Sequence, residues 1–190
     1  MTKAVVVSTI FVFVLATTAL VYSDKSKVIE QHNKYGGVTE ENNYGKGSEE
    51  YEKGIYKIVE YYDKNHRIVE IESYYLDDHA KLDGVAKREQ YYKNEAFEKT
   101  KLKEAQFYYT KEYANKEGIR ESKQHYNEHE RKTKTEFHYT DSYTRKKNIS
   151  RLDAVYDSSG SVYRHIYYDK DGKVFSIEEK KDGEFKRVGP

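Results

Sequence analysis

The chain has 190 residues, of which 35% are charged, and its formal net charge is +1. This balance argues against a dedicated nucleic-acid-binding protein, because such a protein needs a basic excess to displace counterions. The sequence contains no cysteine, which excludes a disulfide framework, a thiolate metal site and a cysteine nucleophile.

The first 23 residues are typical of a secretory leader. A basic start with Lys3 precedes an apolar run over residues 4–22, and small residues flank a possible cleavage site before Asp24. The run is also long enough to span a bilayer as a helix, so residues 1–23 are expected to be a signal peptide or an N-terminal membrane anchor. Either form predicts an exported domain that is periplasmic, secreted or membrane-anchored, with membrane contact only through this segment.

Residues 24–51 are polar and contain four glycines, each of which would weaken a helix or a strand. This composition predicts a flexible linker. The strands are expected to begin near Tyr51, which predicts a Tyr-rich β-repeat domain over residues 52–190.

Tyrosine is abundant, at 21 residues, and recurs in clusters through the domain. The last tyrosines of successive clusters are separated by 13, 17, 17, 17, 13, 17 and 12 residues. A period this short, without the 3.6-residue apolar stripe of a helix, predicts a repeat of strands and turns. The clusters end at Tyr62, Tyr75, Tyr92, Tyr109, Tyr126, Tyr139, Tyr156 and Tyr168.

Residues 67–75, 101–109 and 132–139 show the period-two alternation that indicates strands. Aliphatic residues are scarce beyond the leader, so we expect a thin core held by cross-strand pairs that contribute about 0.2–1 kcal/mol each. The predicted fold is all-β, an antiparallel up-and-down meander of about nine strands that forms an open twisted sheet. A small up-and-down barrel is the alternative, and an N-terminal hydrophobic helix is expected to precede either form.

Residues 154–185 contain two units in which Tyr-Asp is followed by a turn glycine, Gly160 in the first unit and Gly172 in the second. These units resemble the YD-type and MORN-like β-hairpin repeats of exported bacterial proteins, in which each hairpin has an aromatic residue in the strand and a glycine in the turn. Upstream units keep the tyrosine and lose the glycine. The resemblance implies the architecture of a cell-envelope repeat protein and no activity.

The stretch Asp169-Lys170-Asp171-Gly172 could be a calcium loop or a hairpin turn. Its carboxylates and Glu178 partly match a calcium-binding loop, but Tyr167 occupies the first ligand position and no flanking helices are predicted. A tight turn explains the same residues, because Asp accepts backbone hydrogen bonds and Gly adopts positive φ. We predict a hairpin turn.

Residues 125–129, HYNEH, formally match a zinc-protease pattern in which His125 and His129 would hold the metal and Glu128 would polarise water. That chemistry requires a helix, and here the pattern runs from a predicted strand into a turn. The sequence also lacks a nucleophile elbow, a phosphate-binding loop and a dinucleotide fingerprint. No catalytic residue and no cofactor are therefore predicted, and zinc binding by His125 and His129 remains the outlying alternative.

The tyrosine rows are the best binding hypothesis, since Tyr gives rigid amphipathic contact area at a low entropic cost. Some of these rings are instead expected to replace the missing aliphatic core. The preferred interpretation is a non-enzymatic binding or structural module of the cell envelope, with an unidentified protein, peptide or glycan partner. The alternatives are a small extracellular metal-dependent hydrolase and a ligand-carrying barrel. The candidate binding residues are Tyr75, Tyr92, Tyr109, Tyr126 and Tyr139.

Overall fold

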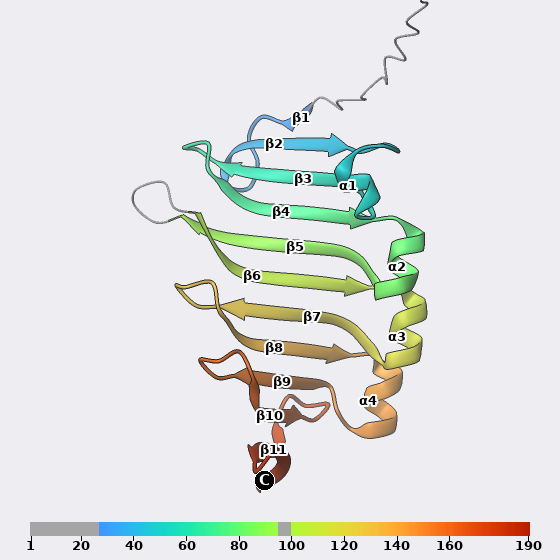
Figure 1. Ribbon diagram of the computed structural model, residues 1–190, viewed down its shortest axis with the longest axis vertical. Helices are drawn as coiled ribbons and strands as arrows, with labels where there is room; N and C mark the ends of the chain where they lie inside the picture. Colours follow the sequence, from blue (N-terminus) through green and yellow to red (C-terminus); the bar gives the residue numbers. More distant parts are fainter. Residues whose placement is uncertain (1–26, 95–99) are drawn as a thin grey trace, which may run out of the picture.

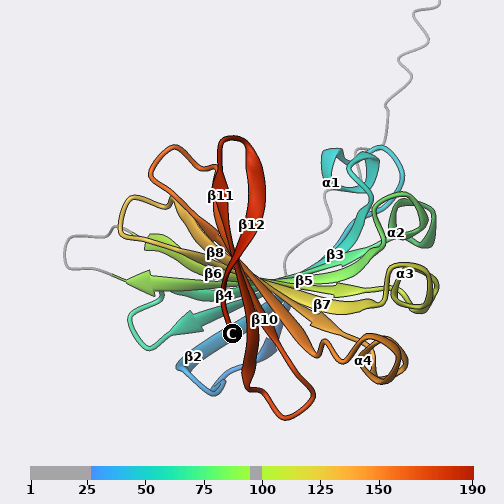
Figure 2. The ribbon, with the colours of Figure 1, turned by 90° about the horizontal axis from the view of Figure 1, so that it is seen from below.

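The computed structural model describes residues 27–94 and 100–190 and contains one twelve-stranded antiparallel sheet. Each strand pairs with its neighbours in the sequence, so the predicted up-and-down meander is confirmed (Figure 1). The first and last strands do not pair with each other, so the sheet is open and the small-barrel alternative is wrong. The sheet is also twisted: viewed along the long axis of the molecule, successive strands are rotated relative to one another (Figure 2).

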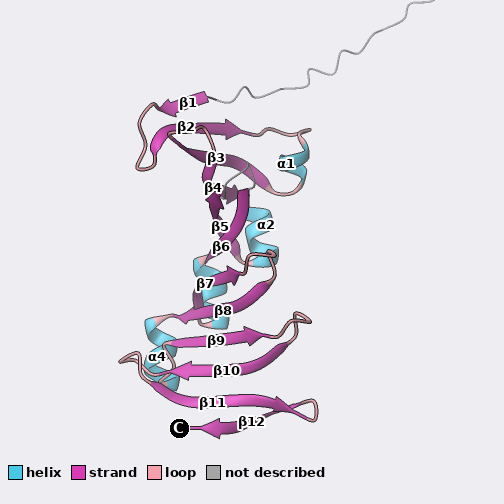
Figure 3. Ribbon diagram, turned by 90° about the vertical axis from the view of Figure 1, so that its left-hand side faces the viewer, coloured by secondary structure: helices cyan, strands magenta, loops and turns pink. Residues whose placement is uncertain are grey.

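Short helices and hairpin turns alternate along the chain. The strands are β1 (Lys27–Glu30), β2 (Gly36–Asn43), β3 (Ile55–Asp63), β4 (Ile68–Tyr75), β5 (Val85–Asn94), β6 (Thr100–Tyr109), β7 (Ile119–Tyr126), β8 (Lys132–Tyr139), β9 (Arg151–Tyr156), β10 (Val162–Tyr168), β11 (Val174–Lys181) and β12 (Glu184–Gly189). The helices are α1 (Glu49–Glu52), α2 (Asp77–Asp83), α3 (Lys111–Glu117) and α4 (Asp141–Lys147). The helices lie at one end of the strands, together with the turn between β10 and β11, and the turns between β3 and β4 and between β7 and β8 lie at the other end (Figures 1 and 3).

The estimate of about nine strands is too low, because it followed the tyrosine clusters. Strands β1, β2 and β12 carry no tyrosine and were missed. The sheet consequently begins at Lys27 rather than near Tyr51, and part of the segment expected to be a linker is paired β-structure. The predicted leader over residues 1–23 lies outside the described residues. No helix in the described part of the chain is long and apolar enough to cross a membrane.

Three of the 17-residue intervals between tyrosine clusters contain a helix that the sequence analysis did not detect. Intervals beginning at Tyr75, Tyr109 and Tyr139 each contain a seven-residue helix, whereas the 13-residue intervals contain only a tight hairpin turn. Seven residues make only two helical turns, which is too short to show an apolar stripe. From β3 to α4 the repeating unit is therefore a hairpin followed by a helix, and β9 to β12 follow without one.

Each helix packs on the end of the helix before it. The Gly84 that ends α2 has a φ of +74°, and a Cβ at this residue would lie 2.1 Å from the ring of Tyr113 in α3. Gly118, which ends α3, lies under Tyr143 of α4 in the same way. The Gly84 carbonyl also accepts a hydrogen bond from the backbone N–H of Thr110, at 2.7 Å. A glycine at these positions allows both the left-handed backbone and the close ring contact.

The turns that follow β3, β7, β9 and β10 share one hydrogen-bonding pattern. In the turn between β3 and β4, the Asp63 side chain accepts from the backbone N–H groups of Asn65 and Arg67, at 2.8 and 3.0 Å. Asp169 forms the same two bonds in the turn between β10 and β11. The predicted hairpin turn at Asp169 is thereby confirmed, with Gly172 in the positive-φ position and strands on both sides.

The core is thin, as the sequence indicated. The buried hydrophobic residues in the described ranges are Val59, Ala80, Ala105 and Ala154, and more polar than apolar side chains are buried there. A single sheet layer cannot enclose large aliphatic side chains. Its order must instead come from lateral contacts between neighbouring strands.

The two faces of the sheet differ in charge. Residues directly opposite each other on neighbouring strands point to the same face, so the strand register assigns the residues of β4–β9 to faces. The ionic face carries Glu70, Glu72, Glu89, Tyr91, Glu104, Gln106, Lys123, His125, Lys134, Glu136, Asp153 and Val155. The neutral face carries Ile71, Ser73, Arg88, Gln90, Ala105, Phe107, Ser122, Gln124, Thr135, Phe137, Leu152 and Ala154. Among these twelve residues of the neutral face, only Arg88 is charged.

Candidate ligand groove on the neutral face

The five predicted binding tyrosines all lie on the neutral face, because each is an even number of residues from a neutral-face residue in its strand. The rings of two of these tyrosines pack on tyrosines of the helices. The ring of Tyr109 stacks on Tyr113 with centroids 4.7 Å apart, and the ring of Tyr139 stacks on Tyr143 at 4.4 Å. These two rings anchor the helices to the sheet and therefore serve the structural role that we expected for some of the tyrosines.

Two further tyrosines border small hollows. Tyr75 lines a hollow of about 170 Å³ with His79 and Phe107. Tyr126 lines one of about 210 Å³ with Leu102, and its hydroxyl donates to the Gln124 side chain at 2.7 Å. Both hollows are smaller than the usual range of roughly 300–1,000 Å³ for ligand sites. Tyr75 also lines a second hollow with Tyr51 and Tyr56, of about 550 Å³, which lies within that range.

The remaining predicted tyrosine, Tyr92, lines a groove of about 600 Å³. Tyr62 of β3 and Tyr92 of β5 lie on either side of β4, which contributes Ile68 and Ile71 between them. The two tyrosine-bearing strands are two strand spacings apart, or roughly 9.5 Å. The groove therefore has an aliphatic floor between two aromatic residues, and we call it the Tyr62–Tyr92 groove. Its lining residues are Tyr62, Asn65, His66, Arg67, Ile68, Ile71, Tyr92 and Thr100.

The hairpin turn between β3 and β4 holds one end of this groove. His66 has a φ of +61°, which is unusual for a residue with a side chain, and its ring stacks on Tyr62 with centroids 5.0 Å apart. Glycine occupies the same turn position at Gly172, where no ring contact is made. The left-handed backbone at His66 therefore places an imidazole ring at the groove, where strain of this kind often marks function.

The groove has little net charge. Its single permanent cation, Arg67, forms two hydrogen bonds with the Asp63 carboxylate, at 2.9 and 2.7 Å. Burial, with the nearby carboxylates of Glu60 and Glu40, raises the pKa of Tyr62 to about 12. Burial also raises the pKa of Tyr92. Both phenols stay neutral at physiological pH, so the groove suits an uncharged ligand.

Tyrosines of the ionic face form a different structure that sequence reasoning missed. Their hydroxyls donate to carboxylates on the same face: Tyr74 to Glu72 at 2.8 Å, and Tyr91 and Tyr108 to Glu89 at 2.7 and 2.9 Å. Many clusters end in two adjacent tyrosines, such as Tyr91-Tyr92, and adjacent residues of a strand point to opposite faces. The first tyrosine of each such doublet was therefore the signal in the sequence for a second row of tyrosines on the other face. These rings are held by hydrogen bonds within the sheet and are not available to stack on a ligand.

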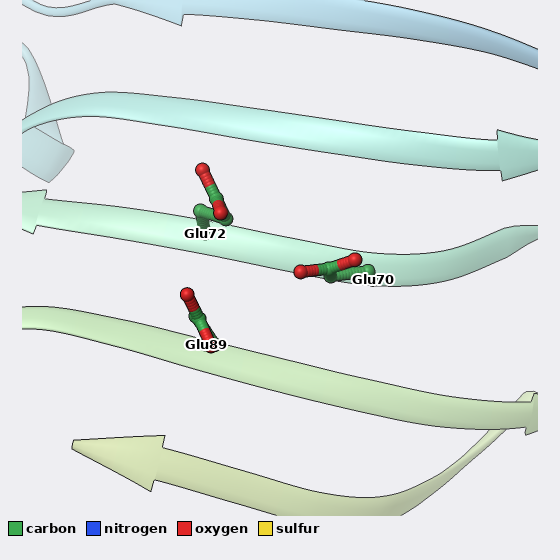
Figure 4. A group of neighbouring side chains, drawn as sticks. All are labelled: Glu70, Glu72 and Glu89. Atoms are coloured by element: carbon green, nitrogen blue, oxygen red, sulfur yellow. The ribbon is translucent and has the colours of Figure 1, made fainter. Parts of the chain in front are cut away.

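The carboxylates of Glu70, Glu72 and Glu89 lie close together on β4 and β5 (Figure 4). Oxygen atoms from all three lie within 4.8 Å of one another, as in a cation site. Lys87 already donates to Glu72 and Glu89 at 2.7 and 2.8 Å, and Lys34 forms an ion pair with Glu70 at 2.7 Å. All three carboxylates thus already have a lysine of the protein as a partner.

The zinc-protease pattern is divided between two environments. His125 lies in β7, where its Nε2 is 2.9 Å from Glu136 and its Nδ1 is 3.5 Å from Glu104. His129 lies in the exposed turn before β8, with Nε2 3.5 Å from Glu128. The two histidines have different carboxylate partners and no helix holds them on one face, so the structure does not bring them together as ligands.

Comparison with known proteins found no matching family model, no matching curated protein and no matching solved structure.

Proposed function

We propose that this chain is a non-enzymatic binding module of the cell envelope, and that the Tyr62–Tyr92 groove binds a sugar unit of a neutral glycan. The observation that carries the proposal is the groove itself, which is about 600 Å³ in volume, is bordered by two tyrosines and has its cation, Arg67, paired with Asp63. This volume lies within the usual range of ligand sites, roughly 300–1,000 Å³.

The chemistry of the groove fits a sugar ring. The flat apolar face of a pyranose stacks on tyrosine, and Tyr supplies such contact area with little loss of side-chain entropy. The spacing of roughly 9.5 Å between the two tyrosine-bearing strands leaves room for one flat ring over the isoleucine floor. The Asn65 amide and the His66 imidazole, also in the lining, can form hydrogen bonds with hydroxyl groups.

Two features of the sequence support the location and the class of protein. The apolar leader over residues 1–23 favours export, either by cleavage or as an anchor. The hairpin units of residues 154–185, which resemble YD-type and MORN-like repeats, favour a binding or structural role over catalysis. The hydrolase alternative has less support, because His125 and His129 have separate carboxylate partners.

The proposal is tested by titrating the purified protein with neutral oligosaccharides of β-linked glucose and N-acetylglucosamine, using calorimetry. Binding should weaken at least tenfold in the Tyr92→Ala variant, because one stacking wall is lost. The Tyr163→Ala variant is the control, since this tyrosine is exposed on β10 and does not line the groove. Failure of all the oligosaccharides to bind, or binding that survives Tyr92→Ala, would refute the proposal.

A further inference from the structure

Both edge strands of the sheet carry exposed hydrophobic side chains beside charged ones. Eight large hydrophobic side chains are exposed in the described residues, and four of them lie on the edge strands β1 and β12. These four are Val28 and Ile29 on β1, with exposed fractions of 43% and 48%, and Phe185 and Val188 on β12, with 37% and 44%. Natural edge strands normally carry charges or proline at such positions, because the outward N–H and C=O groups are free to pair with another strand.

Both edges contain a β-bulge, and the bulged residues are apolar. The register shifts between Val28 and Glu30 on β1, which leaves Ile29 as the extra residue. It shifts between Arg187 and Gly189 on β12, which leaves Val188 as the extra residue. Each bulge thus presents an apolar side chain at its edge.

The edges also match each other in direction and charge. The sheet has twelve alternating strands, so β1 and β12 run in opposite directions, and β1 of a second copy placed beside β12 would continue the antiparallel order. One row of opposed residues on the ionic face begins at Glu30 of β1 and ends at Lys186 of β12. Continuing this row into the next copy pairs Lys186 with Glu30, which carry opposite charges.

We infer that the chain associates head to tail with further copies of itself through antiparallel pairing of β12 with β1. The contact joins two different edges, so it is heterologous and extends into an open filament rather than closing as a dimer. Every new interface leaves one β1 edge and one β12 edge free, and the two ends of the assembly remain competent for growth. This surface is separate from the Tyr62–Tyr92 groove, so assembly would array many grooves along one continuous sheet.

Sedimentation velocity of the purified chain at increasing concentration is the primary test. A weight-average mass that rises with concentration is expected, and Ile29→Lys or Val188→Lys should abolish the rise by placing a charge in the joint. Leu82→Lys is the matched control, because Leu82 is 80% exposed on α2 and lies away from both edges. A parent chain that stays monomeric, or an equal effect of Leu82→Lys, would overturn the inference.

A charge exchange distinguishes specific pairing from general aggregation. Glu30→Lys places like charges across the joint between identical copies, and Lys186→Glu does the same with the opposite sign. Each variant alone should associate about tenfold more weakly than the parent. An equimolar mixture of the two variants restores opposite charges at every joint and should recover association. If the mixture associates no better than either variant alone, the proposed pairing of β12 with β1 is wrong.

Discussion

The contact between Gly84 and Tyr113 allows a quantitative test of how the repeats are held together. In the Gly84→Ala variant the new Cβ would lie 2.1 Å from Cδ2 of Tyr113, a separation that no side chain tolerates, so the ring must move. Its displacement would break the stack on Tyr109, whose centroid is 4.7 Å away. Such aromatic pairs contribute about 0.5–1.5 kcal/mol beyond the area they bury.

Backbone strain adds to this loss. The φ of +74° at Gly84 is unfavourable for alanine by about 1–2 kcal/mol. The two effects together should lower the free energy of unfolding by about 1.5–3.5 kcal/mol, or the melting temperature by roughly 3–14 °C for a chain of this length. Urea unfolding followed by far-ultraviolet circular dichroism measures the free energy directly.

Gly160→Ala is the matched control. Gly160 has a φ of +82°, but a Cβ there would have no neighbour within 4 Å, so only the strain of about 1–2 kcal/mol should appear. Combining Gly84→Ala with Tyr113→Ala should reduce the cost of the glycine substitution to that strain alone. If Gly84→Ala is no more destabilising than Gly160→Ala, the stacking of helix on helix does not hold the repeats together.

Two further predictions concern the ionic face and the groove. Burial opposes ionisation of Glu136, but the hydrogen bond and charge of Lys134, together with His125, lower its pKa from 4.5 to about 2. A lowered folded-state pKa stabilises the protein above pH 4.5, and this stabilisation is lost as the pH falls towards 2. Glu136→Gln should therefore lose less stability than the parent over this pH range in urea titrations, and an unchanged pH profile would refute the assignment. In the groove, His66→Gly should change the free energy of unfolding by less than about 1 kcal/mol, because relief of the left-handed strain offsets the lost stack on Tyr62. The same variant should weaken oligosaccharide binding, and retention of full affinity would show that the imidazole does not contribute to the groove.

Strand positions were readable from the sequence because their cause is local. Alternation of side chains along a strand has period two wherever the strand lies, so residues 132–139 were recognised as a strand and form β8. The Asp169 turn was predictable for the same reason, since its hydrogen bonds join residues only two and four positions apart. The helices were missed because two helical turns are too short for a periodic signal. The 17-residue intervals were nevertheless four residues longer than the 13-residue intervals, which have only a hairpin turn.

Strand pairing and packing decided what the sequence could not. The register separates the two tyrosines of each doublet, directing Tyr91 to a hydrogen bond with Glu89 and Tyr92 to the groove beside Ile71. A doublet looks the same in either role, because the distinction depends on residues one or two strands away. The sequence also did not determine whether the sheet is open or closed. That depends on whether β1 and β12, which lie at opposite ends of the chain, pair with each other. Local alternation thus indicated most of the strands, while long-range contacts determined which tyrosines pack on helices and which line the groove.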